Sequence, residues 1–184
     1  MESTVIRSDP PERRPAVADL REIILGAQDN LINVLATVLG VAIGSGSTKI
    51  VALAGLASGI AEAISMGGVL YTSTCAERDL HKQAGGSEAA ATGLKDPLRA
   101  AVVTFVAALF AAAIPLAPFA FLSIRPAMFT AAVLSVMALF GLGGYKGGVT
   151  GRPWWRDGIQ FVAIGSLAAV ASALVGAALK TDVG

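Results

Sequence analysis

The chain has 184 residues, of which 54% are hydrophobic and only 15% are charged, and its formal net charge is +1. A soluble domain carries about 25% charged residues, so this composition excludes an ordinary soluble enzyme and a disordered chain. The absence of a basic stripe excludes a nucleic-acid-binding protein. The single cysteine, Cys75, excludes an intramolecular disulfide and a multi-cysteine metal site. The sequence therefore indicates an integral membrane protein.

Five apolar segments are long enough to cross a bilayer, whose hydrocarbon core of about 30 Å needs roughly 20 helical residues. Residues 1–20 are charged and contain three prolines, so they predict a short non-helical tail. The connections after the first and third segments are short. The first and second segments, and likewise the third and fourth, are therefore each predicted to form an antiparallel hairpin. The fold class is thus an all-α integral membrane protein with five transmembrane helices. The predicted spans lie at about 23–44, 50–71, 98–122, 127–144 and 158–179, in one domain over residues 21–180.

Lysine and arginine residues are unevenly distributed between the two sides of this arrangement. Eleven of them lie in the tail or in the second and fourth connections, and only Lys49, Arg125 and Lys180 lie on the other side. Basic residues accumulate on the cytosolic side, so the N-terminus is predicted to be cytosolic and the C-terminus to lie opposite. No signal peptide precedes the first span, which favours a bacterial plasma membrane, or a vacuolar-type membrane in a eukaryotic cell.

Two carboxylates lie well inside the predicted spans. At 1.5 Å per residue, Asp29 lies roughly 9 Å from the cytosolic start of the first span. On the second span, Glu62 and Met66 lie roughly 14 Å and 8 Å from the cytosolic end. The three side chains can therefore share one level of the membrane, with Glu62 and Met66 on one helix face. A carboxylate inside a bilayer is costly and usually marks a pathway.

Asp29, Glu62 and Met66, with the amide oxygen of Asn33, form a candidate metal site. Carboxylates bind divalent cations, and a thioether shifts the preference toward Fe²⁺ or Mn²⁺ and away from Mg²⁺ and Ca²⁺. Carboxylates lose their protons when they bind metal, so metal and protons compete. These residues predict a transporter of Fe²⁺ or Mn²⁺ with no resident cofactor and no enzymatic activity. The alternative is a membrane scaffold or assembly subunit in which the buried acids only stabilise helix packing.

Small residues form two rows along the first two spans. Such rows let helix backbones approach closely. We expect them to pack a homodimer through spans one and two. The rows consist of Gly26, Asn30, Asn33, Thr37, Gly40 and Gly44 on the first span, and of Gly55, Gly59, Ala63 and Gly67 on the second.

The order of several motifs resembles the vacuolar iron transporter family. The strings are REIILGAQDN in the first span, LAGLASGIAEAISMGGVLYTSTCAERDL in the second, AAIPLAPF in the third, and GLGGYKGGVTGRPWWRDGIQFVAIGSLAA across the last two. The resemblance covers about residues 21–178. It implies a five-helix homodimer that moves Fe²⁺ or Mn²⁺ out of the cytosol in exchange for protons. The path in such members runs between the protomers, lined by the first two helices.

The resemblance also assigns residues. It places the family's transmembrane aspartate on Asp29, its methionine on Met66, and an acidic residue of the cytosolic mouth on Glu22. Asn30 stands where members usually carry glycine. Plant-like members insert a long acidic domain between the second and third spans, whereas only about residues 72–97 are available here. Any metal-gathering site in this segment is therefore expected to be reduced or absent.

Overall fold

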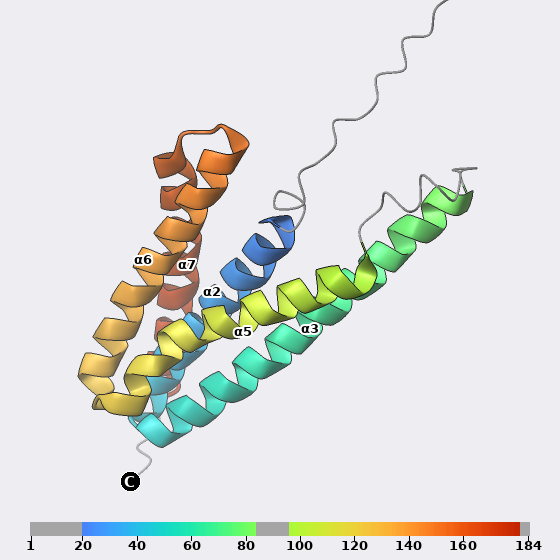
Figure 1. The fold of residues 1–184 in the computed structure, drawn as a ribbon. Coiled ribbons are helices and arrows are strands. Elements are labelled where there is room, and N and C mark those ends of the chain that lie inside the picture. Colours follow the sequence, from blue (N-terminus) through green and yellow to red (C-terminus); the bar gives the residue numbers. More distant parts are fainter. Residues whose placement is uncertain (1–19, 84–95, 181–184) are drawn as a thin grey trace, which may run out of the picture.

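The computed structural model describes residues 20–83 and 96–180, and within these ranges the chain forms five long helices (Figure 1). Each of them is long and apolar enough to cross a membrane, as the sequence predicts. Of the predicted tail, only Leu20 lies within the described residues, and it begins the first helix. The helices are α2 (Leu20–Ser45), α3 (Thr48–Gln83), α5 (Pro97–Phe121), α6 (Ile124–Thr150) and α7 (Trp154–Ala178).

Two helices, α3 and α6, continue at least six residues past the ends of their predicted spans. The apolar run of α3 ends near Tyr71, but the following residues contain neither proline nor glycine, and the helix continues to Gln83. Its 36 residues span roughly 54 Å, well beyond a hydrocarbon core of about 30 Å. α6 likewise continues to Thr150, where Gly151 caps the helix in the left-handed conformation. Hydropathy therefore marks the lipid-embedded part of a helix, whereas backbone propensity decides where the helix ends.

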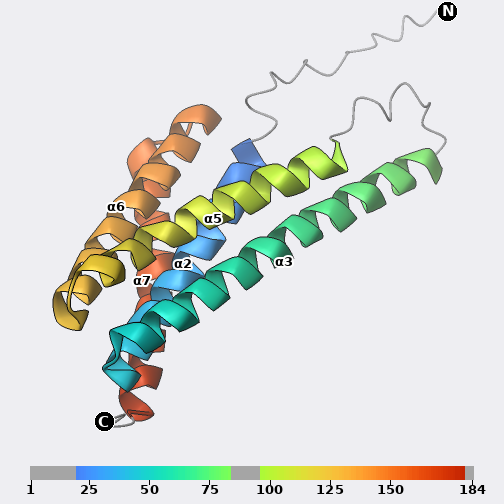
Figure 2. The same ribbon diagram turned by 60° about the horizontal axis from the view of Figure 1, so that its bottom comes forward.

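Successive helices run in alternating directions, so the connections gather at two ends of the bundle (Figure 2). One end holds the start of α2, the end of α3, the start of α5 and the connection from α6 to α7. The other end holds the short turns after α2 and after α5, together with the last residues of α7. Both predicted hairpins are present. The alternation also places Lys49, Arg125 and Lys180 at the end opposite to the other described cations.

α2 occupies the centre of the bundle, because it packs against each of the other four helices. Its buried side chains Val34 and Val38 join α3, α5 and α6 in one apolar cluster around Ala112 and Ala131. α3 packs mainly against α2 and α5. Its outer face exposes a series of large apolar side chains, which are Leu53, Leu56, Ile60 and Ile64.

The glycines of the small-residue rows pack against helices of the same chain, so they are not free to form a homodimer interface, and the homodimer through spans one and two stays a prediction. A Cβ atom on Gly59 of α3 would lie 3.0 Å from Ala112 of α5 and 3.3 Å from Val34 of α2. On α2, Gly40 and Gly44 are closed off by α7, where they face Ser172 and Gly176. A repeat of small residues indicates close helix contact without indicating which helix supplies the partner.

Candidate metal site

The predicted site lies on the antiparallel pair α2 and α3. A tight turn at Gly46, whose φ of 64° suits glycine, reverses the chain between them. Thr37 Oγ1 lies 3.5 Å from Ser58 Oγ, which sets the register of the two helices. One turn further along α3 in this register, the side chain of Glu62 interacts with those of Asp29 and Asn33 of α2. The structure therefore brings together the two carboxyl groups and the amide that the sequence singles out.

Burial distinguishes these residues from the core. Asp29, Asn33, Glu62 and Met66 are all half-buried, so they lie along an open edge of the α2–α3 pair and not in an enclosed cavity. Met66 follows Glu62 by one helical turn on the same face of α3. A carboxylate facing lipid costs several kcal/mol, and this edge therefore needs a polar or protein covering within a membrane.

Asn30 ties three helices together beside the carboxyl pair. Its side chain is completely buried, and its amide nitrogen donates to the Gly59 carbonyl of α3 at 3.0 Å and to the Ala108 carbonyl of α5 at 2.9 Å. Because Asn30 adjoins Asp29, these two bonds also fix the α2 backbone at the site. In the sequence, Asn30 belongs to a small-residue row and stands where members of the vacuolar iron transporter family usually carry glycine, and neither feature predicts its two hydrogen bonds.

Glu22 is separate from this group. It precedes Asp29 by seven residues, roughly 10 Å along the helix axis, and it is almost completely buried. Glu22, Gly26 and Asn30 follow one another at intervals of four, on the face of α2 that packs against Thr104 and Ala108 of α5. Glu22 therefore lies toward α5, while Asp29 and Asn33 face α3. Its assignment to the cytosolic mouth stays a prediction.

The site has few ligands within one chain. Among residues 20–83 and 96–180, no three His, Cys, Asp or Glu side chains come together in a way that could hold a metal ion. Asp29 and Glu62 supply two carboxylates, to which Asn33 can add an amide oxygen and Met66 a sulfur. These donors suit a transition metal better than an alkaline earth. Their role as ligands is a prediction that the geometry makes chemically reasonable.

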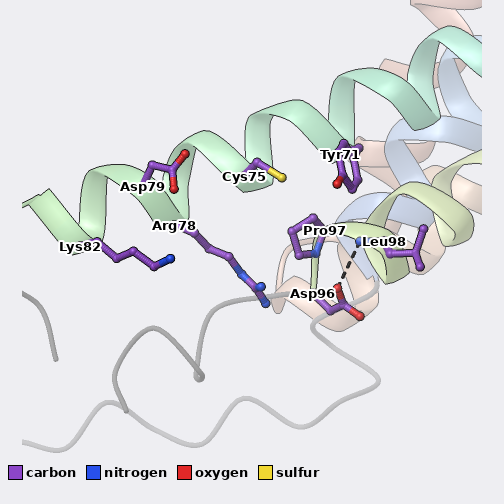
Figure 3. Close-up of a pocket in the computed structure, with 8 residues that line it drawn as sticks. All are labelled: Tyr71, Cys75, Arg78, Asp79, Lys82, Asp96, Pro97 and Leu98. Carbon is purple, nitrogen blue, oxygen red and sulfur yellow. Dashed lines mark hydrogen bonds between the residues drawn. The ribbon is translucent and has the colours of Figure 1, made fainter. Parts of the chain in front are cut away.

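A second polar region lies where α3 extends past the bundle. A cavity of about 420 Å³ opens there between α3 and the start of α5 (Figure 3). Its charged lining mixes cations with acids, namely Arg78 and Lys82 with Asp79 and Asp96. Asp96 accepts a hydrogen bond from the Leu98 backbone at 3.2 Å and so caps α5. Any metal-gathering site in the segment 72–97 is expected to be reduced or absent, and residues 84–95 of this segment lie outside the described residues.

Comparison with known proteins decides the family. The model of the VIT family matches residues 20–93 and 86–177, which is nearly all of the helical domain. The chain belongs to the VIT family of vacuolar iron transporters. It is also 28% identical over 159 residues to vacuolar iron transporter homolog 4 of Arabidopsis thaliana, covering 83% of this chain and 79% of the relative. Members of the VIT family are transporters and not enzymes, and membership indicates that this multi-pass membrane protein transports iron or a related metal.

Proposed function

We propose that this VIT family member moves Fe²⁺ or Mn²⁺ out of the cytosol in exchange for protons. The observation that carries the proposal is the interaction between the side chains of Asp29 and Glu62 inside the membrane-spanning part of the bundle. Two carboxylates in contact repel each other when both are ionised, and a proton or a cation between them relieves that repulsion. A divalent metal binds best when both groups are deprotonated, so each metal ion that binds displaces protons.

The direction of transport follows from charge. Of the ten lysines and arginines within the described residues, seven lie at one end of the bundle, and the positive-inside rule favours a cytosolic location for that end. A proton gradient directed into the cytosol would protonate Asp29 and Glu62 from the opposite side and release the metal there. Export into the surroundings of a bacterial cell, or into a vacuole, follows from this orientation.

A homodimer would complete the site. Asp29, Asn33 and Glu62 are half-buried on a single chain, and two carboxylates are few for a divalent metal ion. A second copy packed on the open edge of α2 and α3 would exclude lipid from the carboxylates and double the number of ligands. Within a membrane, close packing and interhelical hydrogen bonds would hold such a copy, because apolar side chains gain little by leaving lipid.

The test is metal uptake by purified protein in liposomes. We expect Fe²⁺ and Mn²⁺ to enter liposomes with an acidic interior faster than liposomes without a pH gradient. Mg²⁺ serves as the comparison ion, because a site with a sulfur donor disfavours it. Absence of metal uptake under every gradient would overturn the proposal and favour the membrane scaffold.

A further inference from the structure

A groove between α2 and α6, away from the metal site, has the shape and charge of a lipid site. It encloses about 380 Å³ at the end of the bundle where α2 begins and α6 ends. Arg21 and Lys146 stand on its rim. Its apolar lining consists of Leu20, Ile24, Leu25 and Val149. The groove therefore combines a hydrophobic channel with two cations.

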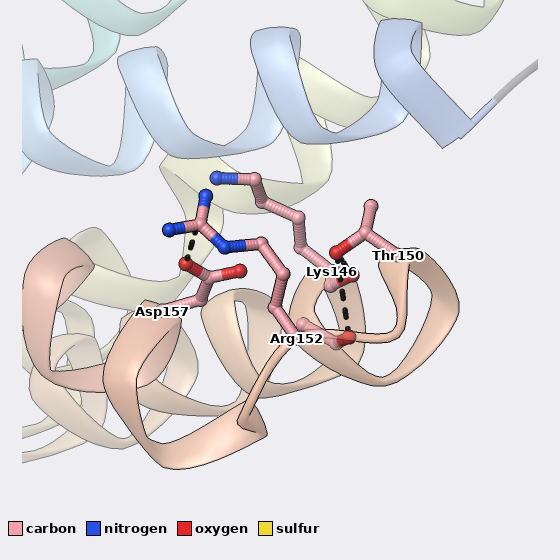
Figure 4. A network of polar contacts seen from close by, with 5 residues as sticks. Lys146, Thr150, Arg152 and Asp157 are labelled. Carbon is pink, nitrogen blue, oxygen red and sulfur yellow. Dashed lines mark hydrogen bonds and ion pairs between the residues drawn. The ribbon is translucent and has the colours of Figure 1, made fainter.

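The described residues do not balance the charges on the rim. Within the described ranges, no carboxylate forms an ion pair with Arg21 or Lys146. The neighbouring Arg152 differs, because its guanidinium lies 4.0 Å from the buried carboxylate of Asp157 (Figure 4). The Lys146 ammonium lies 5.2 Å from the centre of the Phe161 ring, which attracts a cation without neutralising it. The rim thus keeps a net positive charge.

The depth of the groove matches the headgroup region of a bilayer. Trp154 and Trp155 begin α7 at the same end of the bundle, and both rings are exposed. Tryptophan gathers at the interface between the hydrocarbon core and water. The apolar floor of the groove would then meet acyl chains, while Arg21 and Lys146 would meet lipid phosphates.

We propose that this groove binds one anionic phospholipid, with an acyl chain along Ile24, Leu25 and Val149 and the phosphate between Arg21 and Lys146. Basic pockets between transmembrane helices are known to recognise anionic headgroups. The Thr150 hydroxyl is not available to the phosphate, since it donates to the Lys146 carbonyl at 2.9 Å. Recognition therefore depends on the two cations and on the apolar channel.

Native mass spectrometry of the full chain in detergent, with equal amounts of phosphatidylglycerol and phosphatidylcholine, tests this site. We expect the wild type to retain phosphatidylglycerol preferentially. Each cation removed should weaken that preference about fivefold, so Arg21→Gln with Lys146→Gln should nearly abolish it. The matched control, Lys49→Gln with Lys180→Gln, removes the same charge at the opposite end and should retain the preference, as should Lys146→Arg.

Two further measurements separate a lipid from a free anion. Val149→Ser should reduce retention of phosphatidylglycerol without changing the charge, because it weakens the apolar channel. Inorganic phosphate at millimolar concentration should not displace the lipid. The proposal is overturned if the Arg21 and Lys146 double variant keeps its preference, if the control pair loses it equally, or if inorganic phosphate displaces phosphatidylglycerol.

Discussion

Two polar clusters of this protein differ in the signs of their charges. At the end of the bundle, the buried Asp157 faces a cation, Arg152, and the pair neutralises itself. In the α2–α3 pair, Asp29 faces another acid, Glu62, and the neutral amide of Asn33 lies beside Glu62. Opposite charges neutralise each other, whereas two ionised carboxylates side by side need a proton or a cation between them. The comparison supports a structural role for the first cluster and, for the second, the ion binding that we propose.

The largest effect should follow from Asp29→Asn. This change keeps the shape of the side chain but removes one of the two charges that attract the metal. We expect Fe²⁺ and Mn²⁺ uptake to fall to the level of liposomes without protein, while size-exclusion chromatography shows an unchanged species. Glu77→Gln, on the exposed extension of α3, is the matched control and should transport normally. Uptake by Asp29→Asn at the wild-type rate would remove Asp29 from the pathway.

Asn30→Ala tests whether the site depends on the scaffold beside it. The change removes two buried hydrogen bonds, to Gly59 and Ala108, and should lower the free energy of unfolding by about 1–2 kcal/mol. Thermal unfolding in detergent measures this loss. Transport should decline partially, because α2 and α3 are no longer held in register. An unchanged melting temperature would show that the two bonds contribute nothing.

Met66→Ala should have a smaller and more selective effect. The sulfur favours transition metals, so its removal should reduce Fe²⁺ and Mn²⁺ uptake severalfold and narrow their advantage over Mg²⁺ and Ca²⁺. Competition assays with pairs of ions measure the selectivity. Met66→Leu keeps the volume without the sulfur and should match the alanine variant. If both variants keep wild-type selectivity, Met66 only fills space.

Asp157→Asn should have the smallest effect on transport. The distance between the Arg152 and Asp157 side chains is long, at 4.0 Å, and the arginine side chain is 64% exposed. Water can therefore solvate the arginine when the carboxylate charge is removed. We expect uptake within about twofold of the wild type and a slightly lower melting temperature. Loss of transport would show that Asp157 takes part in transport and would contradict the purely structural role of the Asp157–Arg152 pair.

Much of this organisation could be predicted from the sequence. The five spans follow from apolar runs, and the rise per helical residue already puts Asp29 and Glu62 at comparable depths. The sequence could not predict which helix packs against each small-residue row. The row around Gly59 indicates a close helix contact, but only the tertiary structure shows that Ala112 of the same chain fills it. The extension of α3 to Gln83 was missed because hydropathy reports lipid contact, not helix continuity.

The role of Asn30 could not be predicted for the same reason. Its two acceptors are backbone carbonyls of α3 and α5, which carry no sequence signature. A buried asparagine in an apolar helix signals that its amide has a partner, but not whether the partner is a group of this chain, a group of a second copy or a metal ion bound to the amide oxygen. Only the fold shows that the acceptors of the amide nitrogen lie on α3 and α5 of this chain.

The central claim is that metal and protons compete for Asp29 and Glu62. The most direct measurement follows Mn²⁺ uptake and internal pH together in liposomes, for the wild type and for Glu62→Gln. An amide exchanges no proton, so the pH dependence of uptake should be strong in the wild type and weak in Glu62→Gln. Protons should leave the wild-type liposomes as metal enters. Metal uptake without proton movement, or an unchanged pH dependence in Glu62→Gln, would contradict the claim.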